Sequence, residues 1–342
     1  MLDVYLTARF SRIGKAYLPK RHYRSGGRAV LRIVVSAEGS TAAVEPEGAH
    51  PLVESVARVD RVVTLLSFRM LDAPGMLDGR GARWIACAEA LSDPAFFPRW
   101  RGMVARRLAE QYAHVPEKAL VPDKTTAGYV LQWYLVIPSY VGGLLFHSAR
   151  RVPSLAPGQL SFRLESAALQ EVALCPGRFW CLPGDPDAGH PDAVPVPDEV
   201  ALGAVLRRQV IAHAARFLRV YDPQVRFGRR TQWAAVTDVL DSAMLLAGRS
   251  FGSPQAGASD ARLVLAKGEK PLTSASTICQ VSDDRGRVHW TRLRGSCCFL
   301  CAARGGASVR QLPAGQRRRT GADLRHAQPG LSPSLACLQI GG

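Results

Sequence analysis

The stretch that decides the fold is TTAGYVLQWYLVIPSYVGGLLF, residues 125–146, a long run without a charged side chain. It is long enough to cross a bilayer. Gln132, Pro138, Ser139 and a glycine pair interrupt its apolar character, and such interruptions make a poor span through lipid. We therefore predict the core helix of a globular protein, broken near Pro138 because proline removes a backbone donor.

Four other segments have apolar residues at three- and four-residue intervals, which is the spacing of one helix face. They are residues 83–91, 101–113, 199–221 and 229–248. Asp198 is the expected N-cap of the third. Helices should therefore carry most of the mass of the protein.

Three segments have the apolar and β-branched pattern of paired strands around a turn: residues 28–46, 159–174 and 276–299. Residues 175–198 contain six prolines and should be largely loop. The predicted fold class is α+β, with a mainly helical body, short β-hairpins and a small C-terminal cysteine module.

The expected organisation has four parts. Residues 1–250 form the helical body, including the N-terminal hairpin, and residues 251–270 form a linker. Residues 271–300 form the C-terminal module. Residues 301–342 hold six arginines and one acid with few large apolar side chains, so no stable fold is expected there.

Charge raises the question of an anionic partner. Lys and Arg number 44 against 28 Asp and Glu, a net charge of +16. Arginine far outnumbers lysine and the chain is rich in Ala, Gly and Pro, which is typical of a GC-rich genome, so basicity alone is weak evidence for binding. No nucleic-acid partner is expected in the favoured interpretation. The opening MLDVYLTARFSRIGK lacks a secretory pattern. We expect a cytoplasmic protein, with peripheral contact at the inner face of the membrane left open.

Common catalytic motifs are absent from the sequence. The segment GRGARW from Gly79 lacks the third glycine and the preceding strand of a dinucleotide site, and there is no Walker lysine motif, G-x-S-x-G or H-E-x-x-H. His147, His213 and His289 are expected to be surface or satisfied core residues. Arg229 and Arg230 precede a helix and could face an anionic ligand, although a solvated face is the expected role.

Eight cysteines in a reducing compartment seldom form disulfides, so their clustering carries more information than their number. Five are scattered and are expected to be buried or incidental: Cys87, Cys175, Cys181, Cys279 and Cys337.

Cys297, Cys298 and Cys301 form the one tight group. Thiolates bind zinc and iron–sulfur clusters, and both sites ordinarily need four ligands. These three residues alone leave a cluster, a zinc site and a buried strand end open.

The segment WTRLRGSCCF, residues 290–299, resembles the C-terminal signature of the ferric-siderophore reductase family of the FhuF type. That signature is a basic lead-in, Cys-Cys, ten residues, then C-x-x-C. YVLQWYLVIPSYVGGLLF and RRTQWAAVTDVLDSAM look like the two core helices of the family. The resemblance covers residues 90–299 and stops where the second cysteine pair belongs.

The genetic code offers an explanation for the missing second cysteine pair. Ser308 to Asp323 can be written with codons that, read one base later, spell PCGNCPLVSDDERVR. The new cysteines fall at the codons of Val309 and Leu312, which restores the family spacing from Cys298. We therefore predict a frameshift near Leu300 or Cys301, which would make Cys301 an accident of the shifted frame.

The resemblance implies an oxidoreductase that binds a ferric siderophore and reduces its iron by one electron through a 2Fe–2S cluster. Cys297 and Cys298 are the implied ligands, and Cys301 is a further candidate metal ligand. Because no dinucleotide motif is present, the electron donor should be a ferredoxin or a separate NAD(P)H-dependent reductase. Binding of the cluster is expected to be weakened or lost in this chain.

Two other classes of protein remain open. One is a redox-inactive siderophore-binding or siderophore-biosynthesis-like protein, and the other is a basic nucleic-acid binder. Visible absorption separates the first class from both, and a steep salt dependence of DNA affinity would indicate the last.

Overall fold

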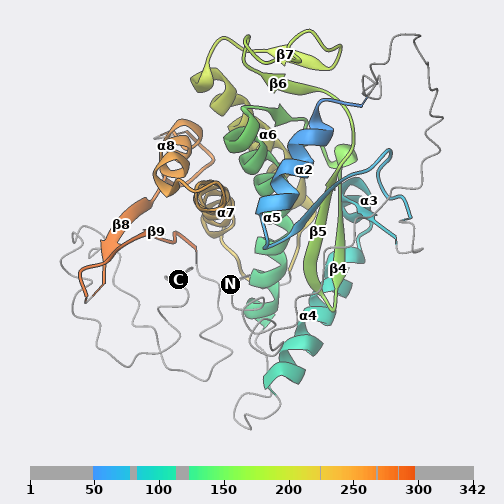
Figure 1. Ribbon diagram of the computed structural model, residues 1–342. Coiled ribbons are helices and arrows are strands. Elements are labelled where there is room, and N and C mark those ends of the chain that lie inside the picture. Colours follow the sequence, from blue (N-terminus) through green and yellow to red (C-terminus); the bar gives the residue numbers. More distant parts are fainter. Residues whose placement is uncertain are drawn as a thin grey trace, which may run out of the picture.

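The computed structural model describes residues 49–77, 83–112, 123–223, 225–266, 269–283 and 285–296 (Figure 1). The described residues are mainly helical with several small sheets of short strands, so the predicted α+β class is confirmed. The hairpin expected at residues 28–46 and the tail at residues 301–342 lie outside the described residues.

The described helices are α2 (Leu52–Val62), α3 (Cys87–Ser92), α4 (Phe96–Tyr112), α5 (Asp123–Ala149), α6 (Glu199–Val220), α7 (Arg229–Ser250) and α8 (Pro254–Val264). Helix α5 is the centre of the core, and α2, α4, α6 and α7 all pack against it. It is the one described helix long and apolar enough to cross a membrane. Its most apolar stretch of 18 residues is 94% buried inside the protein, which is typical of the core helix of a globular protein.

The prediction of a break near Pro138 is wrong. Helix α5 continues through this residue, and every residue from 133 to 146 is buried. Proline removes one backbone donor, but packing on all sides holds the helix on either side of it.

The strands form three small sheets. The first has the order β1 (Ser67–Met70), β5 (Ala168–Leu174), β4 (Leu160–Glu165), β2 (Ile85–Ala86). The second has the order β3 (Val152–Pro153), β6 (Phe179–Cys181), β7 (Ala193–Pro195), and the third pairs β8 (Ile278–Ser282) with β9 (Val288–Arg292). The predicted hairpins at residues 159–174 and 276–299 are thus confirmed as β4–β5 and β8–β9.

Local predictions on either side of α6 are also confirmed. Residues 175–198 are mostly turns, with only the short strands β6 and β7. Asp198 caps α6, since its carboxylate accepts a hydrogen bond from the backbone N–H of Ala201 at 2.7 Å. A charged acceptor at this position satisfies a helix N–H that has no partner within the helix.

The linker expected at residues 251–270 is not what the structure shows there. Most of this segment is helix α8, capped by the Ser253 hydroxyl, which accepts from Ala256 N at 3.2 Å. Gly257 lies so close to α7 that an added Cβ would meet Met244 O at 2.4 Å and Gly248 Cα at 2.9 Å. Gly257, one of the glycines that suggested a linker, therefore permits close helix packing. The division into domains stays a prediction.

Candidate functional site

The cysteine group 297–301 lies outside the described residues, but the chain that leads into it is described up to Ser296. Cys297 follows Ser296 in the sequence, so the contacts of Ser296 are the last described ones before the cysteine pair. These contacts come from α7.

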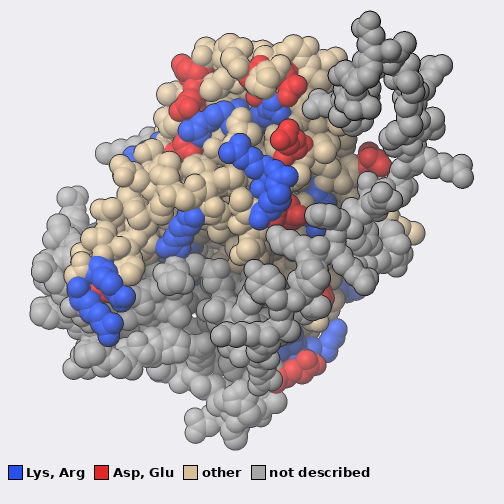
Figure 2. All heavy atoms as spheres, in the orientation of Figure 1, with Lys and Arg blue, Asp and Glu red and all other residues tan. Residues whose placement is uncertain are grey.

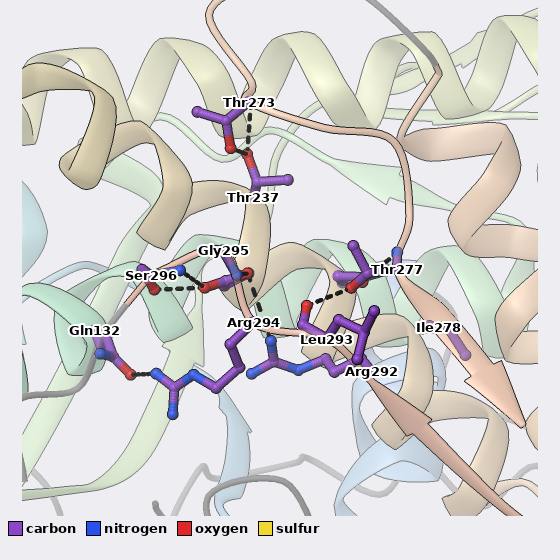
Figure 3. Close-up of polar contacts among 12 residues, drawn as sticks. Gln132, Thr237, Thr273, Thr277, Ile278, Arg292, Leu293, Arg294, Gly295 and Ser296 are labelled. Carbon is purple, nitrogen blue, oxygen red and sulfur yellow. Dashed lines mark hydrogen bonds and ion pairs between the residues drawn. The ribbon is translucent and has the colours of Figure 1, made fainter. Parts of the chain in front are cut away.

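Asp238 on α7 fixes the end of the described chain. Its carboxylate accepts hydrogen bonds from the backbone N–H of Gly295 at 2.8 Å and of Ser296 at 2.7 Å, and from the Ser296 hydroxyl (Figure 3). Asp238 and Ser296 are only 5% and 7% exposed. Hydrogen bonds to a buried carboxylate are among the stronger ones in proteins, so the position of Ser296 is well determined.

Asp241 lies three residues further along the same face of α7 and holds the start of β8. It accepts from the Ser276 hydroxyl at 2.6 Å, from Thr277 N at 2.9 Å and from the Thr277 hydroxyl at 2.7 Å. Burial raises the pKa of Asp241, and these hydrogen bonds oppose the rise. Two acids of one helix therefore hold both ends of the β8–β9 hairpin.

Two arginines stand shortly before the cysteines in the sequence, Arg292 as the last residue of β9 and Arg294 just after the strand. Nη1 of Arg292 is 3.6 Å from Oδ1 of Asp238, and Nη2 of Arg294 donates to Oε1 of Gln132 on α5 at 2.8 Å (Figure 3). Burial lowers the pKa of Arg292, and the charge of Asp238 opposes this. Nearby positive charge favours thiolate over thiol, so both side chains suit a site with anionic sulfur.

The number of available cysteine ligands differs from that of a cluster site. Of the other cysteines in the described part of the chain, Cys87, Cys175 and Cys181 are buried and Cys279 is half-buried on β8, all as free thiols. Burial raises the pKa of each of the four. A two-iron cluster needs four thiolates, and the tight group supplies three. The segment held by Asp238 before the cysteines is compatible with a cluster site. The tight cysteine group, however, offers one ligand fewer than a two-iron cluster needs.

A second group of possible ligands was not predicted from the sequence. His50, His190 and Asp192 bring their ligand atoms within 4.8 Å of one another. Both nitrogens of His50 face backbone donors, Leu52 N at 3.2 Å and Gly177 N at 3.3 Å, and Nδ1 of His190 accepts from Asp192 N at 3.1 Å. A neutral imidazole has one acceptor nitrogen.

These backbone donors compete with a cation for the same lone pairs, so we assign the histidine group a structural role in holding the loop between β6 and β7. Burial, with the nearby His190, lowers the pKa of His50, and Asp192 opposes this. The spacing His190-Pro-Asp192 was the one available sequence signal, and His50 joins it only through the fold.

The three histidines examined in the sequence are satisfied, as predicted. Nδ1 of His213 donates to Leu155 O at 2.6 Å, and its Nε2 lies 3.1 Å from the Tyr134 hydroxyl. His147 pairs with Asp260 at 2.6 Å, and His289 lies 3.1 Å from Asp283.

The chain matches no protein-family model and no curated protein.

Proposed function

We propose that this chain is a ferric-siderophore reductase, a cytoplasmic protein whose substrate is a ferric siderophore. One electron converts Fe(III) to Fe(II), and a separate ferredoxin or NAD(P)H-dependent reductase that gives this electron is oxidised. The hard oxygen ligands of a siderophore hold Fe(II) less well than Fe(III), so reduction releases the iron. A 2Fe–2S cluster, when bound, would supply the one-electron step.

The observation that carries the proposal is the anchoring of residues 295–296 by Asp238, directly before Cys297 and Cys298. A cofactor site works when its ligands are held by a rigid element with supporting hydrogen bonds. Helix α7 is such an element, since it packs along the core helix α5. Arg292 and Arg294 add positive charge to the segment that precedes the cysteines in the sequence.

The experiment compares the chain as written with a version in which the alternative frame is restored after codon 300. Iron, sulfide and visible absorption are measured for both. We expect the restored protein to contain a red-brown, reducible cluster and the chain as written to hold little or none. Absence of a cluster from the restored protein, or a full cluster in the chain as written, would contradict the proposal.

Single cysteine variants locate the ligands in the restored protein. Cys297→Ser and Cys298→Ser should each abolish the cluster. Cys279→Ser is the matched control, because Cys279 is a half-buried thiol of the adjoining hairpin outside the proposed ligand set. Its cluster content should equal that of the unsubstituted restored protein.

The incomplete ligand set favours one alternative for the chain as written, namely a redox-inactive siderophore-binding or biosynthesis-like protein. Binding of a ferric siderophore is measured by quenching of tryptophan fluorescence. Equal affinity of both versions, with no cluster in either, would indicate the alternative.

A further inference from the structure

Exposed arginines gather where α6 ends and α7 begins. Five side chains make up this surface, which we call the basic end: Arg216, Arg219, Arg226, Arg229 and Arg230. None of the five forms an ion pair with another residue that the structure describes. Residues 207–237 contain a single acid, Asp222. The basic end is therefore a local excess of positive charge.

Some arginines elsewhere on the described surface are paired with acids, and the unpaired ones there are spread over several elements. Arg99 pairs with Asp93 at 2.5 Å and Arg287 with Asp283 at 2.8 Å. On the face shown in Figure 2, several basic side chains lie next to acidic ones, mainly in the upper part of the view. Unpaired like charges repel one another, and a surface of one sign attracts partners of the opposite sign.

Part of the basic end, Arg229 and Arg230, is on the same helix as Asp238, which anchors the segment before the cysteines. Arg230 and Asp238 are eight residues apart on α7, which corresponds to about 12 Å along the helix axis. A partner docked at the basic end would therefore lie close to the chain that leads into Cys297.

We propose that the basic end is the docking surface for the electron donor, a small redox protein with an acidic face. The proposal rests on the proposed function, in which the electron must come from a separate protein. Electron-transfer encounters bury little area and depend on charge for their association rate. Five exposed arginines and one strongly exposed valine, Val220 at 44%, within residues 216–230 have the composition of such a surface.

The same composition disfavours a lipid partner. Stable binding to a membrane surface needs large apolar side chains beside the basic ones. Of the described residues in 216–230, Val220 is the one large apolar side chain that is strongly exposed. Tyr221 in this segment and Trp233 after it are buried, and Phe227 is half-buried. Buried rings are also unable to stack on the bases of a single-stranded nucleic acid.

The test measures affinity of the chain as written for an acidic plant-type 2Fe–2S ferredoxin, used as the probe, by surface plasmon resonance at low salt. The variant reverses three charges, Arg219→Glu, Arg229→Glu and Arg230→Glu. The matched control is Arg61→Glu, an exposed arginine of α2, which packs on α5 and β1. Thermal unfolding of each variant establishes that it is folded.

We expect the triple variant to lose about tenfold or more in affinity, mainly through slower association, and the control to change by less than about twofold. Added salt should weaken the unsubstituted protein more than the triple variant. Equal losses in both variants, or no binding of ferredoxin, would overturn the proposal.

Vesicles containing phosphatidylserine and a DNA duplex are tested in parallel. If the triple substitution abolishes binding to either of these but leaves ferredoxin binding unchanged, the assignment of the surface is also overturned. None of these measurements depends on the cluster, so a failure here is distinguishable from a failure of the proposed function.

Discussion

Replacing Asp238 by asparagine should release the end of the anchored segment while leaving the body folded. Oδ2 accepts both the Ser296 N–H and its hydroxyl, and Oδ1 accepts the Gly295 N–H. An amide keeps one acceptor oxygen and places N–H donors against the donors of Ser296. The substitution also removes the charge beside Arg292.

The magnitude follows from the bonds that are lost. A hydrogen bond to a charged group contributes about 1.5–3 kcal/mol, and two are lost at Ser296, so the segment should lose at least about 3 kcal/mol of local stability. Amide exchange at Gly295 and Ser296 should then accelerate about a hundredfold, since 1.4 kcal/mol corresponds to a factor of ten.

Hydrogen exchange followed by mass spectrometry or NMR measures this effect, and Asp241→Asn is the matched comparison. That variant should accelerate exchange at Thr277, whose N–H Asp241 accepts at 2.9 Å, more than at Ser296. Unchanged exchange at Gly295 and Ser296 in Asp238→Asn would refute the anchoring role of this carboxylate.

Two further predictions concern the body of the protein. Gly257→Ala should destabilise it by about 1–3 kcal/mol or more in urea unfolding, because the added Cβ would meet Met244 O at 2.4 Å. Gly102→Ala, on α4 with nothing within 4 Å of the added Cβ, should instead stabilise by about 0.5–1 kcal/mol, and a loss in both variants would contradict the packing explanation. Burial lowers the pKa of His213 to about 4. As the pH falls from about 6.5 to about 4, this imidazole is protonated in the unfolded chain but stays neutral in the folded one, so the folded state loses stability over this range. Between pH 7 and 5 this loss amounts to about 2 kcal/mol, and His213→Gln should show a correspondingly smaller loss in urea unfolding; identical pH profiles would exclude His213 as the source.

The sequence predicted those elements whose signals are local. The apolar run at residues 125–146, the cap at Asp198 and the hairpin at 159–174 each depend on neighbouring residues, and the structure contains all three. The failures at Pro138 and at residues 251–270 have one cause. Proline and glycine are unfavourable in an isolated helix, but tertiary packing outweighs this propensity where α5 and α8 are buried against their neighbours.

The anchor at the candidate site could have been suspected from the sequence. Asp238 and Asp241 lie one turn apart in the otherwise apolar segment WAAVTDVLDSAMLLA, and buried acids need partners. Their partners at residues 276–277 and 295–296 follow only from the fold. The same holds for His50, which meets His190 and Asp192 across a long separation in sequence.

Helix α7 has a mechanical consequence for the molecule. Its first turn carries two arginines of the basic end, its middle carries both anchoring acids, and its last turns contact α8 through Gly248. A helix of this length is about 33 Å long and stiff on that scale. A displacement of the first turn of α7 should therefore be accompanied by displacement of the β8–β9 hairpin and of α8. Insertion of a single residue between Arg230 and Asp238 would rotate the first turn of the helix relative to the anchoring acids by about 100°.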